Sequence, residues 1–193
     1  MRQTNLLEGM RVAILAGDDV EQSELVEPKK ALESAGATTA LVSPHAGSIQ
    51  GVNHDEKADT FPVDITLDQA DPDEFDGMLL PGGALNADAL RVEPRAQAFA
   101  RRIDEQNKPI AVICHGPWLL ISAGLVHGRT LTSYQTIQDD LRNAGGHWLN
   151  LEVVCDGNWV SSRSPRDLPA FNREMLARFA AYYAERQDAG TAA

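Results

Sequence analysis

Cysteine is scarce in this chain, and long apolar runs are missing. The 193 residues include only Cys114 and Cys155, a number that argues against a disulfide framework. No segment approaches the roughly 20 consecutive apolar residues of a transmembrane helix. The first residues also lack the apolar run of a secretory signal. We therefore expect a protein of the reducing cytoplasm.

Basic residues are also few relative to acidic ones. Lys and Arg together number 17 against 28 Asp and Glu, which gives a formal net charge of −11. Nucleic acids and anionic membranes are polyanions, and both require a basic surface on the proteins that bind them. The charge therefore argues against a nucleic-acid partner and against a membrane partner.

The sequence lacks internal repeats and low-complexity tracts, and its length suits one domain. Apolar strand-like runs alternate with helical patterns, an order typical of a parallel sheet covered by helices. We expect a single α/β domain over residues 10–186, with tails at residues 1–9 and 187–193.

The predicted elements follow from apolar runs, prolines and glycines. We expect strands at 11–16, 38–43, 75–80 and 109–113, and hairpins at 47–64, on the sheet edge, and at 151–162 around Asp156-Gly157. One helix should begin at Pro28 and end at Gly36. Further helices are expected at 86–107 with a restart at Pro94, at 118–123, at 135–144 and from Asp167 onward.

The most informative segment is Pro109-Ile-Ala-Val-Ile-Cys-His-Gly-Pro-Trp118. A strand ends at Cys114, Gly116 permits a tight turn, and a helix follows, which is the layout of a nucleophile elbow with Val112 at the usual glycine position. The turn presents Cys114 at the carboxyl edge of the sheet. The helix N-terminus would stabilise a thiolate. The alternative is an inert buried cysteine.

Two other segments should meet Cys114 at this edge. The paired glycines Gly82 and Gly83 end the preceding strand, so their N–H groups, with that of His115, could form an oxyanion hole. A simple turn is the alternative. The bend after the first strand carries Asp18, Asp19 and Glu21; a carboxyl there could hydrogen-bond the sulfur, or the cluster could be a solvated loop.

The remaining cysteine and histidines carry no predicted chemistry. Cys155 is expected to be a small core residue of its strand. No metal is expected, because the remaining histidines lack metal-ligand spacing and suit surface or satisfied positions: His45, His54, His127 and His147.

Together the segments resemble the PfpI family of intracellular cysteine peptidases and deglycases. This family is a branch of the class I glutamine amidotransferase-like superfamily, which also contains the parkinsonism-associated deglycase. The resemblance implies a flavodoxin-like three-layer sandwich with a mostly parallel sheet and a small inserted β-hairpin. The matching stretches span nearly the whole domain in order: 19–28, 59–63, 79–83, 111–118, 128–134, 139–145 and 156–163.

The resemblance also implies roles for single residues. Cys114 maps to the nucleophile, His115 to a proposed base or acid, and Glu21 to the glutamate that contacts the sulfur. Asp88 matches a carboxylate that completes the peptidase triad from a neighbouring subunit, where some members have Glu, so a homodimer or higher homo-oligomer is expected. Glutamine amidotransferase activity is excluded, because no His-x-Glu pair follows Cys114.

Three functions remain open. In the first, Cys114 attacks a small-molecule carbonyl or a glycated protein without a cofactor, as in a glyoxalase or deglycase of the stress response, and Glu21 shuttles a proton. In the second, Cys114, His115 and a neighbour's Asp88 cleave peptides. In the third, Cys114 is a non-enzymatic redox sensor.

Overall fold

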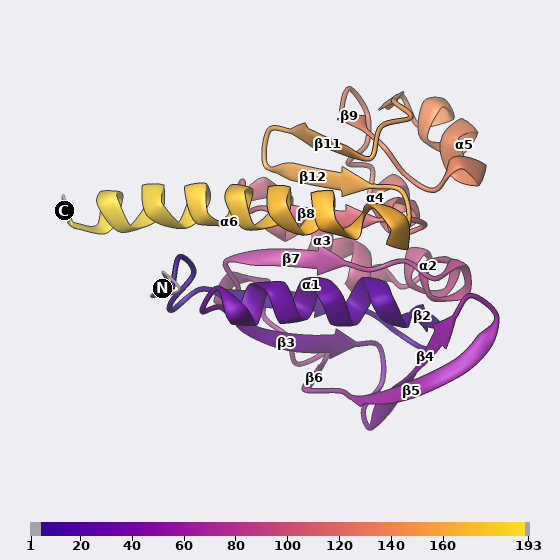
Figure 1. Ribbon diagram of the computed structural model, residues 1–193, viewed down its shortest axis with the longest axis horizontal. Coiled ribbons are helices and arrows are strands. Elements are labelled where there is room, and N and C mark those ends of the chain that lie inside the picture. The colour runs from indigo at the N-terminus through magenta and orange to yellow at the C-terminus, as the bar shows by residue number, and fades with distance from the viewer. Residues whose placement is uncertain (1–4, 192–193) are drawn as a thin grey trace.

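The computed structural model describes residues 5–191 and has a seven-stranded central sheet (Figure 1). The sheet order is β11-β12-β8-β7-β1-β3-β6, and only β11 runs antiparallel to its neighbour. In chain order, its strands are β1 (Arg11–Leu15), β3 (Thr38–Ser43), β6 (Ile65–Thr66), β7 (Gly77–Leu80), β8 (Ile110–Ile113), β11 (Val153–Asp156) and β12 (Trp159–Ser162).

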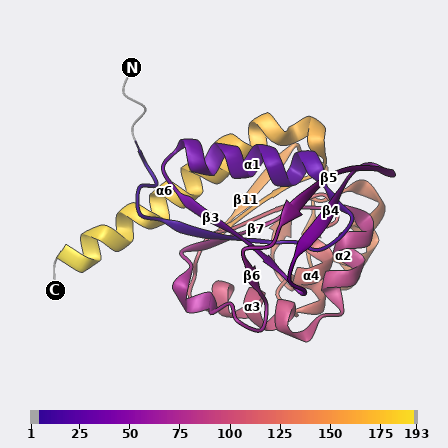
Figure 2. The ribbon, with the colours of Figure 1, turned by 90° about the horizontal axis from the view of Figure 1, so that it is seen from below.

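Helices cover both faces of this sheet, which confirms the predicted three-layer sandwich (Figures 1 and 2). Helices α1 (Gln22–Ser34) and α6 (Leu168–Thr191) lie on one face. The opposite face carries α2 (Ala84–Arg91), α3 (Pro94–Glu105), α4 (Pro117–Ser122) and α5 (Gln138–Asn143). The strand order from β3 through β1, β7 and β8 to β12 is the flavodoxin-like order.

Alternation along the central strands divides the core in two. In β1, Ala13 and Leu15 face the α3 side, whereas Val12 and Ile14 face α1 and α6. All four side chains are fully buried, as expected for a parallel sheet covered on both faces.

The inserted hairpin exists, but its place differs from the prediction. Strands β4 (Ser48–Asn53) and β5 (Glu56–Pro62) pair with β2 (Val20–Glu21) in a separate three-stranded sheet. The edge of the main sheet is β6 instead. The hairpin is therefore tied to the bend after β1, the bend that carries the acidic cluster. Two further short strands pair with each other. Strand β9 (Thr130–Leu131) lies between α4 and α5 in the chain, and β10 (His147–Trp148) lies between α5 and the hairpin of β11 and β12.

Helix α1 begins at Gln22, six residues before the predicted start, and contains Pro28. A proline inside a helix lacks one backbone N–H and normally disfavours the position. Here Pro28 is buried on the same face as Leu25 and Leu32, so packing against the sheet offsets the lost hydrogen bond. The earlier start brings Glu24 onto this inward face.

The predicted tails are partly structured. Leu7 is fully buried, and its N–H donates to the carbonyl of Ala35. At the other end, α6 continues to Thr191. Residues 1–4 and 192–193 of the predicted tails lie outside the described residues. Within the described chain, no helix has the length and apolarity needed to cross a membrane.

The prediction for Cys155 is wrong, because this side chain is exposed. On the edge strand β11 the buried position is its neighbour Val154, and alternation turns Cys155 to the other side. The expected surface position of four histidines is confirmed, since all four are exposed: His45, His54, His127 and His147.

Candidate active site

The candidate site lies where three adjacent strands end. Strands β8, β7 and β1 are neighbours in the sheet, and their carboxyl ends lead into the loops that begin at Cys114, Pro81 and Ala16. This edge is where open α/β sheets bind ligands. The predicted meeting of the cysteine and the paired glycines is therefore present.

Cys114 occupies a sharp, strained turn. Its φ of 61° lies in the left-handed region, which costs a non-glycine residue about 1–3 kcal/mol. Backbone hydrogen bonds hold the turn on both sides: the Cys114 N–H donates to the carbonyl of Ser162 at 3.1 Å, and the Cys114 carbonyl accepts from the Tyr134 N–H at 2.9 Å. The residue is 7% exposed, so most of the cysteine is shielded from solvent.

The carboxyl group beside the sulfur belongs to Glu24, a residue that sequence reasoning missed. Glu24 is fully buried, and its Oε2 accepts a 2.8 Å hydrogen bond from the Gly82 N–H. A Cβ built on Gly82 would lie 2.4 Å from that oxygen and 3.1 Å from Cys114 Sγ. The Glu24 carboxyl group and the Cys114 thiol therefore both lie beside the Cα of Gly82.

Glu21 was predicted to contact the sulfur, and the structure corrects this expectation. Its carboxylate accepts from the backbone N–H of His54 at 3.0 Å and from the Ser23 hydroxyl at 3.3 Å, and it lies 3.6 Å from the His54 ring. The physical reason is the early start of α1. A helix that begins at Gln22 places Glu24 on the stripe of Pro28 and Leu32, which faces the sheet.

The other two acidic residues of the bend point elsewhere. Asp18 pairs with the exposed His45 at 3.0 Å and accepts from the Gln50 N–H. Asp19 has a φ of 61°, and its N–H donates to the Gln50 carbonyl. Both residues fasten the hairpin of β4 and β5 to the bend.

Burial raises the pKa of Glu24 from 4.5 to about 8, and the charge of nearby Glu21 acts in the same direction. Hydrogen bonds from Gly82 and Cys114 oppose the rise. At neutral pH this carboxyl group therefore favours its protonated form, in which it can donate to an acceptor.

Burial also raises the pKa of the Cys114 thiol, and the charge of an ionised Glu24 raises it further. Backbone hydrogen bonds from Gly83 and His115 act in the opposite direction. The sequence suggested that the helix N-terminus would favour the thiolate, but burial outweighs it. The repulsion vanishes when Glu24 holds a proton, so the reactive arrangement is a thiolate beside a neutral acid.

The N–H groups of the two paired glycines have different partners, Glu24 and the Cys114 sulfur. Gly82 was predicted to contribute to an oxyanion hole, but its N–H is bound to Glu24. The N–H groups of Gly83 and His115 face the sulfur instead. Gly83 has a φ of 89°, and a Cβ there would lie 2.3 Å from the Asp19 carbonyl. Only glycine allows this close approach of the two loops.

The structure settles the orientation of His115, which the sequence left open. Its Nδ1 lies 3.2 Å from Cys114 Sγ, and its Nε2 lies 3.5 Å from the Thr136 hydroxyl. The ring stacks on Tyr134 with centroids 4.8 Å apart and contacts Trp118 at 5.3 Å. Burial lowers the pKa of His115, so a neutral imidazole faces the sulfur at neutral pH.

Asp88, the predicted third member of a triad, does not join the site within one chain. It is exposed on α2 and forms no hydrogen bond or ion pair with the residues described. The same helix exposes Leu85, and Val92 follows at its end; the two are 67% and 72% accessible.

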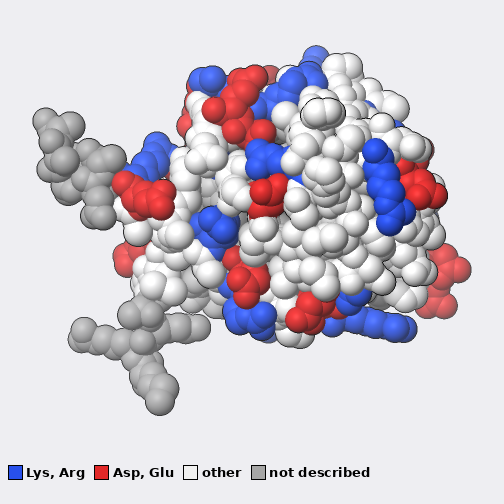
Figure 3. Space-filling model, turned by 90° about the horizontal axis from the view of Figure 1, so that it is seen from above, with Lys and Arg blue, Asp and Glu red and all other residues white. Residues whose placement is uncertain are grey.

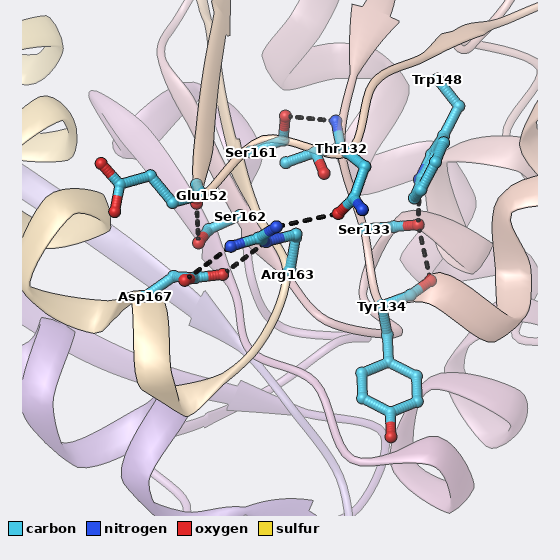
Figure 4. A network of polar contacts seen from close by, with 10 residues as sticks. Thr132, Ser133, Tyr134, Trp148, Glu152, Ser161, Ser162, Arg163 and Asp167 are labelled. Atoms are coloured by element: carbon cyan, nitrogen blue, oxygen red, sulfur yellow. Dashed lines mark hydrogen bonds and ion pairs between the residues drawn. The ribbon is translucent and has the colours of Figure 1, made fainter.

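Figure 4 shows a network of polar contacts around the end of β12. Arg163 forms a two-pronged ion pair with Asp167 at 2.8 and 3.1 Å. The Ser162 hydroxyl donates to the Glu152 carbonyl at 2.6 Å. Because the Ser162 carbonyl accepts from Cys114, this network fixes the strand end on which the cysteine turn rests.

The surface carries charges of both signs. On the face in Figure 3, Lys and Arg side chains are interspersed with Asp and Glu. Within the described residues, no group of three or more His, Cys, Asp or Glu side chains is arranged to hold a metal ion. The reactive groups at this edge of the sheet are therefore the titratable side chains of Cys114, Glu24 and His115.

Comparison with known proteins gives consistent matches. The sequence model of the DJ-1/PfpI family matches residues 10–178. Deglycase TK1284 of Thermococcus kodakarensis is 44% identical over 86% of this chain and 98% of its own length. YraA of Bacillus subtilis, which bears a provisional cysteine protease name, is 40% identical over 86% of this chain and 96% of its own. These names support an enzyme of the DJ-1/PfpI type.

The fold also matches a solved structure. DJ-1beta of Drosophila melanogaster superposes with a TM-score of 0.80 at 24% sequence identity. The match covers 89% of this chain and 90% of that one. This likeness concerns the flavodoxin-like fold.

Proposed function

This chain belongs to the DJ-1/PfpI family, and we propose that it is a cytoplasmic cysteine enzyme acting on reactive carbonyls. Its substrates would be small dicarbonyls such as methylglyoxal and the early adducts that they form on proteins. The deglycase name of TK1284 supports this substrate class. We expect the chemistry to need no cofactor.

The observation that carries the proposal is the buried pair of Cys114 and Glu24 around Gly82. A carbonyl carbon needs a nucleophile, and its oxygen needs a proton as negative charge develops. The sulfur supplies the first and a protonated Glu24 supplies the second. The N–H groups of Gly83 and His115 then stabilise the anionic sulfur or the developing oxyanion.

The reaction with methylglyoxal balances without an external oxidant. The thiolate forms a C–S bond with the aldehyde carbon, and Glu24 protonates the oxygen to give a hemithioacetal. The Glu24 carboxylate then removes the proton from this carbon, which leaves an enediolate, and returns it to the neighbouring carbonyl carbon, while the hydroxyl proton passes from the first oxygen to the second. One carbon is thereby oxidised to a thioester while the other is reduced to an alcohol. Water cleaves the thioester, releasing lactate and the thiol.

A peptidase is the second candidate, and the 3.2 Å contact between His115 Nδ1 and Cys114 Sγ favours it. A neutral imidazole at this distance can accept the thiol proton. The family resemblance assigns the orienting carboxylate to Asp88 of another subunit, so this function would require a homo-oligomer. The provisional protease name of YraA supports it.

The two functions separate in a parallel assay of methylglyoxal consumption and fluorogenic peptide cleavage. We expect Cys114→Ser to abolish dicarbonyl turnover, and His115→Ala and Asp88→Ala to retain most of it. Peptide cleavage that disappears in Asp88→Ala would favour the peptidase. Inactivity of the wild-type protein on both substrates, with ready peroxide oxidation of Cys114, would leave the redox sensor.

A further inference from the structure

We infer that Asn86 is a positioning residue that aims the backbone N–H groups of the glycine loop at Glu24 and Cys114. This inference rests on the proposed function, because it assigns a residue to the same nucleophilic site. Asn86 lies in the first turn of α2 and is fully buried. Neither the sequence patterns nor the family resemblance pointed to it.

The amide nitrogen of Asn86 binds two successive carbonyl groups of the loop. Nδ2 donates to the Gly82 carbonyl at 2.8 Å and to the Pro81 carbonyl at 3.4 Å. The Gly82 carbonyl also accepts from the Glu21 N–H at 3.3 Å. Both loop carbonyls therefore point away from the reacting groups and toward Asn86.

Because each peptide group is planar, these contacts also fix the direction of the loop's N–H groups. In a trans peptide the N–H points opposite to the C=O. The peptide that includes the Pro81 carbonyl also includes the Gly82 N–H, which binds Glu24 at 2.8 Å. The next peptide joins the Gly82 carbonyl to the Gly83 N–H, which hydrogen-bonds the Cys114 sulfur. One side-chain amide thus orients both glycine N–H groups of the site.

The amide oxygen of Asn86 connects this loop to the end of β1. Oδ1 accepts a 2.7 Å hydrogen bond from the Gly17 N–H. Gly17 begins the bend that leads to Glu21 and Glu24, so Asn86 also sets the separation of the two loops. Without the Asn86 side chain, the Gly17 N–H would lose this acceptor and the Gly82 carbonyl would keep only the Glu21 N–H.

The test measures the reactivity of Cys114 rather than turnover alone. Wild type, Asn86→Ala, Asn86→Ser and Asn86→Asp are alkylated with iodoacetamide across a pH series, and Cys114 and Cys155 are quantified separately by peptide mass spectrometry. The exposed Cys155 serves as the internal reference. Asn158→Ala is the matched control, since Asn158 is 6% exposed and its side chain donates to the Lys108 carbonyl at 2.8 Å, away from the site.

We expect the Cys114 rate at pH 7, relative to Cys155, to fall about tenfold in Asn86→Ala, which corresponds to a rise of one pKa unit. Asn86→Asp keeps the acceptor for Gly17 but loses the donor and adds negative charge, so its profile should move at least as far. The Cys114 alkylation profile should shift less in Asn86→Ser than in Asn86→Ala. The dicarbonyl kcat should fall with these rates while KM changes little.

Two results would overturn the inference. One is a Cys114 profile in folded Asn86 variants that overlays the wild type, or that shifts equally in Asn158→Ala. The other is failure of all three Asn86 variants to fold, which would make Asn86 a folding residue only. Shifted alkylation profiles in a protein that turns over no dicarbonyl would instead refute the proposed function and keep Asn86 as a positioning residue.

Discussion

Glu24 and Cys114 form a coupled acid and thiol at the residue scale. Both groups are buried; an ionised Glu24 raises the pKa of the Cys114 thiol, whereas the hydrogen bond from Cys114 lowers the pKa of Glu24. The pair therefore stabilises a state in which one proton is held between them. Glu21 acts on this pair at a distance: its negative charge favours the protonated form of Glu24.

Replacing these two glutamates should have different kinetic effects. Glu24→Gln removes the group that gives and takes protons, so dicarbonyl turnover should fall by about 10² or more. Glu21→Gln should keep substantial turnover. Because the Glu21 charge raises the pKa of Glu24, its removal should move the alkaline fall of the pH–rate profile to lower pH. Equal losses in the two variants, measured by lactate release, would argue against separate roles.

The strands and helices differ in how far the sequence predicts them. The strands were predictable because their apolar runs stop within a few residues of a glycine or a proline. The elbow at Cys114 was predictable because strand, turn and helix follow within a few residues. The start of α1 was not predictable in the same way. Pro28 signals a first turn in sequence, yet here it packs inside the helix. The predicted start left Glu24 outside the helix, so its place on the inward face was not seen, and the resemblance was carried over to Glu21 instead.

Other site features depend on contacts that are distant in the sequence. The spacing of Glu24 from Pro28 and Leu32 is a helical stripe, so a longer helix could have revealed Glu24. Asn86 gives no such pattern, because its partner Gly17 lies 69 residues away. The exposure of Cys155 likewise depends on β11 being an edge strand, which local alternation does not show.

The loop after β7 should tolerate no side chain at Gly82. In Gly82→Ala the new methyl group would lie 2.4 Å from Glu24 Oε2 and 2.6 Å from Cys114 Cβ. The overlap must separate the acid from the sulfur, at a cost of about 1–3 kcal/mol in stability. We expect at least a tenfold loss of turnover in a folded protein.

Gly47→Ala is the control for this prediction. Gly47 has a φ of 96°, and a methyl group added there would meet nothing within 4 Å, so the change adds backbone strain without contacting the site. Thermal unfolding should show a loss of stability in both variants, and lactate release should fall in Gly82→Ala alone. Unchanged turnover in Gly82→Ala would contradict the packing described.

At the scale of the whole molecule, the buried acid links stability to pH. The folded chain keeps a proton on Glu24 up to about pH 8, whereas the unfolded chain releases it near pH 4.5. Between these values the folded state binds more protons, so its stability falls as pH rises. Below pH 4.5 both states are protonated, and this penalty is absent.

Glu24→Gln should therefore flatten the pH dependence of unfolding. Urea unfolding at pH 5, 6.5 and 8 should show wild type losing up to about 1.4 kcal/mol per pH unit relative to the variant. The lowered pKa of His115 acts in both proteins and cancels in the difference. Parallel curves for the two proteins would mean that Glu24 titrates normally in the folded chain.

Nucleophilic attack by Cys114 is tested most directly by detecting the substrate on its sulfur. Glu24→Gln keeps the nucleophile but cannot complete proton transfer, so a reaction with methylglyoxal should stall on Cys114. Acid quenching and peptide mass spectrometry should then find about one substrate equivalent on Cys114 of Glu24→Gln and none at that position in Cys114→Ser. An unmodified Cys114, or a Cys114→Ser protein that still releases lactate at the wild-type rate, would contradict nucleophilic attack by this thiol.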